Sequence, residues 1–88
     1  MATKTWKLGE VCKGGIITIE TTKTQVKVIA KEWVSSKEWN RLEVNLSEKD
    51  SRSKIDWFLF DLTTSYWTDE ILKWIESKVE FKTNGLWD

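Results

Sequence analysis

Apolar and polar residues alternate in the middle of the chain, over the segments 26–34 and 39–46. A period of two is typical of a strand that turns one face toward a core. The apolar positions that share this face are Val26, Val28, Ala30, Val34, Leu42, Val44 and Leu46. Segment 16–20 is short, apolar and β-branched, and predicts another strand. An opening strand over residues 6–11 is less regular, because Gly9 interrupts it.

The segment 54–62, "KIDWFLFDL", is apolar without alternation, and residues 57–60 are four consecutive large apolar residues. We interpret it as the last strand of the sheet, with apolar side chains on both faces. One face would meet a helix, and the other would need a second cover. Self-association is the expected cover. The predicted interface residues are Trp57, Phe58, Phe60 and Trp87.

The period changes after residue 62. Trp67, Ile71 and Ile75 recur at helical spacing, and Thr64 or Ser65 can cap the start of a helix. Asn84-Gly85 is a plausible stop. The sequence therefore predicts one α+β domain over residues 1–88. Four or five strands form an antiparallel meander, and one C-terminal helix packs on one sheet face in two layers.

The composition limits the kinds of catalytic, metal-binding and membrane-spanning features that the chain can have. The chain of 88 residues has seven tryptophans, no histidine and one cysteine. Without histidine the commonest general base and metal ligand is absent, so we expect no enzyme, no catalytic residues, no metal site and no cofactor. Cys12 cannot form an internal disulfide, which favours a cytoplasmic location. No apolar run reaches the ~18 residues of a membrane span, so no membrane association is expected.

Net charge is zero but unevenly placed. Residues 1–54 carry 11 Lys/Arg and 7 Asp/Glu, whereas residues 55–88 carry 3 and 7. The basic part permits an anion-binding surface, and the same asymmetry permits head-to-tail association or mutual neutralisation of the two halves.

The sheet face away from the helix carries the candidate site. If the two alternating strands form a hairpin, two registers keep the faces matched: Trp33 opposite Trp39, or Trp33 opposite Arg41 with Lys31 opposite Glu43. Either register gathers two indoles and several cations. The predicted binding residues are Lys27, Lys31, Trp33, Trp39 and Arg41. Bases stack on such rings and cations neutralise phosphates, so single-stranded DNA or RNA is the predicted ligand.

The layout of strands followed by a helix, with a basic aromatic sheet face, resembles that of single-strand-binding domains of the Pur and Whirly types. The resemblance is one of layout and assigns no residue a role. Two alternatives remain open. The same Trp and Arg residues suit a protein-protein interaction module, such as a small regulator or inhibitor of the kind phages encode. Cross-strand Trp pairs and Trp–Arg contacts also stabilise a sheet by themselves.

Overall fold

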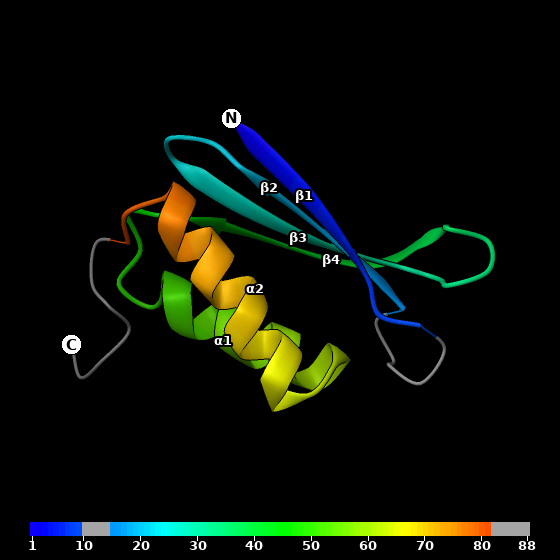
Figure 1. The fold of residues 1–88 in the computed structure, drawn as a ribbon. Coiled ribbons are helices and arrows are strands. Elements are labelled where there is room, and N and C mark those ends of the chain that lie inside the picture. The colour runs from blue at the N-terminus through cyan, green and yellow to red at the C-terminus, as the bar shows by residue number, and fades with distance from the viewer. Residues whose placement is uncertain (10–14, 82–88) are drawn as a thin grey trace.

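The computed structural model describes residues 1–9 and 15–81, and these residues form a sheet layer and a helix layer (Figure 1). The strands are β1 (Ala2–Lys7), β2 (Ile16–Thr21), β3 (Gln25–Lys31) and β4 (Glu38–Asn45). They form an antiparallel sheet in the order β1-β2-β3-β4. The helices α1 (Ser51–Leu62) and α2 (Ser65–Lys78) cover one face of it. The α+β class and the antiparallel meander are confirmed.

The core lies between the sheet and the helices. Val26 pairs with Val44, and Val28 pairs with Leu42. The two valines of β3 are fully buried, and Val44 is nearly so. They pack in one cluster with Ile71 and other buried residues of the helices. The alternation in the sequence therefore identified the core-facing side of β3 and β4 correctly, since every second side chain of a strand points to the same face. The expectation for Val34 was wrong, because β3 ends at Lys31 and Val34 lies in the following turn, where it is exposed.

The prediction of a strand over 54–62 was wrong, because this segment lies within helix α1. Ile55, Leu59 and Leu62 are buried in the core, and their spacing of four and three residues is that of one helix face. Trp57 and Phe60 fall on the other side of the helix and are exposed. The run looked two-sided because a helix distributes consecutive residues around its axis. Within residues 1–9 and 15–81 the chain thus has four strands followed by two helices.

The helix predicted after residue 62 is confirmed as α2. Thr64 is its N-cap, and the Thr64 hydroxyl accepts a hydrogen bond from the Trp67 N–H at 3.4 Å. The helix ends at Lys78, and the predicted stop at Asn84-Gly85 lies outside the described residues. Residues 1–9 and 15–81 contain two helices, α1 and α2. Neither is long and apolar enough to cross a membrane.

The β3–β4 hairpin has neither of the two expected registers. Ile29 pairs with Arg41, and Lys27 pairs with Glu43. The register shifts between Ala30 and Lys31, so that Lys31 pairs with Glu38. Six residues, 32–37, connect the strands, and Ser36 in this turn has a φ of 59°. In the observed pairing Lys27, and not Lys31, lies opposite Glu43, and residue 33 lies outside β3 in the connecting turn.

Candidate functional site

The sheet face away from the helices carries the predicted cations, but it also carries carboxylates at the paired positions. Lys27 of β3 lies opposite Glu43 of β4, and Lys31 lies opposite Glu38. Opposite charges at such positions stabilise a strand pair. Each lysine therefore has an acidic neighbour across the strands, which weakens the attraction of this face for a phosphate backbone.

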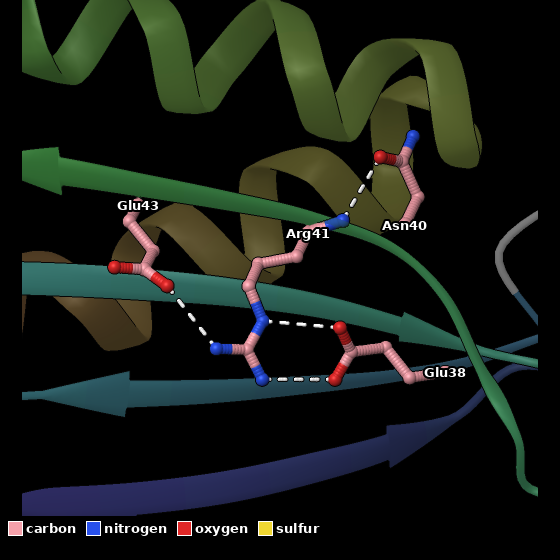
Figure 2. Close-up of polar contacts among 4 residues, drawn as sticks. All are labelled: Glu38, Asn40, Arg41 and Glu43. Atoms are coloured by element: carbon pink, nitrogen blue, oxygen red, sulfur yellow. Dashed lines mark hydrogen bonds and ion pairs between the residues drawn. The ribbon is translucent and has the colours of Figure 1, made fainter.

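Arg41 is held by two carboxylates (Figure 2). Its Nη2 donates to Glu38 Oε1 at 2.9 Å, and its Nε donates to Glu38 Oε2 at 3.1 Å. Its Nη1 donates to Glu43 Oε2 at 3.1 Å. The hydrogen bond from Arg41 holds the pKa of the Glu38 carboxyl below its ordinary value of 4.5, and the same bonds raise the pKa of the Arg41 guanidinium. A phosphate would have to displace these carboxylates to reach Arg41.

The two tryptophans of the predicted site lie near the end of the β3–β4 hairpin. Trp33 follows β3 in the connecting turn, and Trp39 lies in β4 next to the register shift. Each is 39% exposed. The ring pairs found within residues 1–9 and 15–81 do not include a pair between these two indoles. The five predicted binding residues thus lie on one hairpin, with both indoles half-covered and Arg41 already paired.

Helix α1 carries two exposed aromatic side chains, one of which, Trp57, is the most exposed aromatic among the described residues. Trp57 is 72% exposed and Phe60 is 55% exposed. Their ring centroids are 6.2 Å apart and the rings meet edge to face at 79°. Together with Asp56 they line an open pocket of about 180 Å³. We call Trp57 and Phe60 the α1 aromatic pair. Of the other predicted interface residues, Phe58 is half-buried against the core, and Trp87 lies outside the described residues.

The basic side chains of α1 are paired with carboxylates, whereas Asp56 beside the α1 aromatic pair is not paired with a cation in the described part of the chain. Lys54, near the start of the helix, contacts Glu48 at 2.7 Å and Asp50 at 3.7 Å. The hydrogen bond to Glu48 raises the pKa of Lys54. Arg52 contacts Glu76 of α2 at 3.2 Å. Asp56 takes part in no ion pair within residues 1–9 and 15–81. The α1 aromatic pair is therefore bordered by a carboxylate, while both cations of the helix are already compensated.

The sequence named Trp57 and Phe60 as interface residues but placed them on a strand, on opposite faces. The signal for their true arrangement was present, because Ile55, Leu59 and Leu62 repeat at helical spacing and leave the i, i+3 pair 57–60 on the outside. Within the part of the chain that the structure describes, no group of three or more His, Cys, Asp or Glu side chains is placed to hold a metal ion.

No protein-family model, no curated protein and no solved structure matches the chain.

Proposed function

We propose that this chain is a small non-enzymatic protein-binding module, and that the α1 aromatic pair docks on a partner protein. The observation that carries the proposal is the 72% exposure of Trp57 on a helix whose opposite side is fully buried. Tryptophan is the residue type most enriched at the energetic centres of protein interfaces. A helix held by Ile55 and Leu59 in the core presents its outer side chains on a rigid support.

The area of the exposed ring is large enough to matter. A buried tryptophan covers roughly 150–250 Å². With 72% of Trp57 exposed, docking could remove roughly 110–180 Å² from water, or about 2.7–4.5 kcal/mol at 25 cal/mol per Å² before the costs of association. Phe60 lies against the same ring and adds to this surface. The pair can therefore serve as an anchor for binding.

The pocket indicates the chemistry of the partner. Its volume of about 180 Å³ is below the roughly 300–1,000 Å³ of sites for drug-sized ligands, so it suits one side chain better than a cofactor. Asp56 borders the pocket, and Trp57 offers an aromatic surface beside that carboxylate. An arginine can place its guanidinium against an indole and pair with a carboxylate. The preferred partner segment therefore presents an arginine next to a large apolar residue.

Selection from a displayed library of random peptides tests the proposal. We expect the wild-type chain to enrich peptides that combine Arg with Leu, Phe or Trp. Trp57→Ala should abolish their binding, and Asp56→Asn should weaken peptides with Arg more than those with Lys. Tyr66→Ala is the matched control, because Tyr66 is an exposed helical aromatic, at 63%, outside the pocket lining. Enriched peptides that bind Trp57→Ala as well as wild type would refute the proposed surface.

Single-stranded nucleic acid is the second candidate, and the half-exposed Trp33 and Trp39 beside Lys31 favour it. Base stacking on an indole is worth about 1–3 kcal/mol and should quench tryptophan fluorescence. Titration with oligo-dT should then show quenching that weakens between about 50 and 200 mM salt and is lost in Trp33→Ala. Absence of quenching at low salt would eliminate this candidate and leave the protein-binding proposal untouched.

A further inference from the structure

The two edges of the sheet expose different peptide groups. The Leu8 N–H donates to the Gly15 carbonyl at 2.8 Å, which fixes the even-numbered residues of β1 as those bonded to β2. The N–H and C=O groups of Thr3, Thr5 and Lys7 therefore point away from the sheet. At the other edge, the Leu46 N–H donates to the Thr24 carbonyl at 2.8 Å. By the same alternation, the peptide groups of the odd-numbered residues of β4 point outward.

The β4 edge is protected against pairing. The outward N–H of Arg41 donates to the side-chain oxygen of Asn40 at 2.9 Å, as Figure 2 shows. The register of β4 also shifts near its start, between Ala30 and Lys31 of its neighbour. Helix α1 contacts this strand. Irregular register and occupied N–H groups are devices by which proteins prevent edge strands from joining further strands.

The β1 edge lacks these devices in the described part of the chain. Its six residues pair with β2 in one continuous register. Thr3, Thr5 and Lys7 are exposed, and no side chain within residues 1–9 and 15–81 accepts from their N–H groups. The chain contains no proline that could block them. β1 therefore presents a regular edge that can accept another strand in a register that keeps its exposed lysines, Lys4 and Lys7, away from like charge.

We propose that two copies of the chain pair through β1, antiparallel about a two-fold axis, to form one continuous sheet. Only registers that match outward peptide groups with each other are possible. A two-fold axis at Lys4 would place the two Lys4 side chains opposite each other, which is unfavourable. An axis at Thr5 keeps the same overlap, places Lys4 opposite the second Trp6 and places Lys7 opposite the second Thr3. Charge therefore selects the register centred on Thr5.

Two contacts within the chain support this register. The Thr5 and Thr18 hydroxyls are 3.0 Å apart, so the dimer would extend a row of threonines across the axis. Cross-strand threonine pairs stabilise antiparallel sheets. The Lys4 Nζ lies 5.1 Å from the centre of its own Trp6 ring, so this ammonium already sits beside an indole on the helix-covered face. The second chain would bring another indole to the same lysine.

The inference goes beyond the proposed function and does not rest on it. A two-fold axis perpendicular to the sheet places both helix layers on the same side. The dimer would therefore present two α1 aromatic pairs on one side. Binding to a partner with two matching sites would then gain from the high effective concentration of the second contact.

Cysteine cross-linking tests both the dimer and its register, in a Cys12→Ser background so that no other thiol is present. In the proposed register the two Thr5 Cα atoms lie about 5.5 Å apart, within the range of a disulfide. The two Thr3 Cα atoms lie four residues apart along the strands, at least about 13 Å. Thr5→Cys should therefore give a disulfide-linked dimer on mild oxidation, and Thr3→Cys should not.

Light scattering at roughly 500 µM chain supplies a readout without cysteine. Wild type should approach twice the mass of the 10.4 kDa chain. Thr5→Pro removes an outward N–H and should restore the mass of one chain while keeping its circular dichroism spectrum. Glu43→Pro, which changes the β4 edge, should leave the mass unchanged. A monomeric wild type without a Thr5→Cys cross-link, or a cross-link through Thr3→Cys instead, would overturn the proposal.

Discussion

Truncation of Leu59 and truncation of Trp57 are expected to differ sharply in their cost, although the two residues are neighbours on α1. Leu59 is fully buried, and Trp57 is 72% exposed. Leu59→Ala removes packed atoms and leaves a cavity, which costs about 2–5 kcal/mol. A chain of 88 residues has a total stability of roughly 4–13 kcal/mol. This one truncation can therefore remove much of it.

The cost of Trp57→Ala follows from the covered 28% of the side chain. That fraction of roughly 200 Å² corresponds to about 1.4 kcal/mol of apolar burial. Alanine is the better helix former by about 0.5 kcal/mol, which offsets part of the loss. The net cost should be about 1 kcal/mol, with a small addition for the edge-to-face contact with Phe60.

Urea unfolding followed by far-ultraviolet circular dichroism measures both variants, because this signal does not depend on the tryptophan that is removed. A strand over 54–62 would place Trp57 and Leu59 on the same face and make their costs similar. Equal losses above about 2 kcal/mol for both variants would refute the outward placement of Trp57. They would also remove the basis for the proposed binding surface.

Three further predictions concern other parts of the fold. Gly15→Ala should destabilise the chain by at least about 1 kcal/mol more than Gly9→Ala. Both glycines have positive φ, but only at Gly15 would a Cβ lie 2.9 Å from the Lys31 carbonyl oxygen. Equal unfolding midpoints for the two variants would contradict this prediction. Thr64→Ala should cost about 0.5–1 kcal/mol through the lost cap of α2, and Ser65→Ala almost nothing, in the same urea assay. Because the folded pKa of Glu38 is lowered, its stabilisation is present above pH 4.5 and is lost as pH falls through the folded pKa. The melting temperatures of wild type and Glu38→Gln should therefore converge on acidification, and a constant difference would count against the ion pair.

The parts of the fold that the sequence predicted correctly are those in which the apolar period decides. Val26, Val28 and Val44 alternate with polar residues and do face the core. Trp67, Ile71 and Ile75 repeat at helical spacing and lie on α2. At these positions local periodicity agrees with the placement in the fold, so a reading of the sequence and the tertiary packing lead to the same answer.

The prediction failed where a short run of consecutive apolar residues is compatible with either a buried strand or a helix. The segment 54–62 was predicted as a strand, although Ile55, Leu59 and Leu62 repeat at helical spacing, and burial of these residues in the core selects the helix. The contacts of the candidate site were also beyond what the local sequence pattern could predict. The sequence could place Arg41 on the open sheet face, but its hydrogen bonds with Glu38 depend on the register shift at Lys31. Hairpin register follows from turn geometry, which composition does not specify.

The measurement that tests the central claim most directly is a two-dimensional nitrogen–proton spectrum of the tryptophan side chains. The chain has seven tryptophans, and each indole contributes one N–H signal. On titration with a peptide that presents arginine beside leucine, the Trp57 signal should shift and be saturable, while the signals of Trp33 and Trp39 stay in place. A Trp57 signal that does not move, together with shifts of Trp33 and Trp39 on addition of oligo-dT, would contradict the account and assign binding to the sheet.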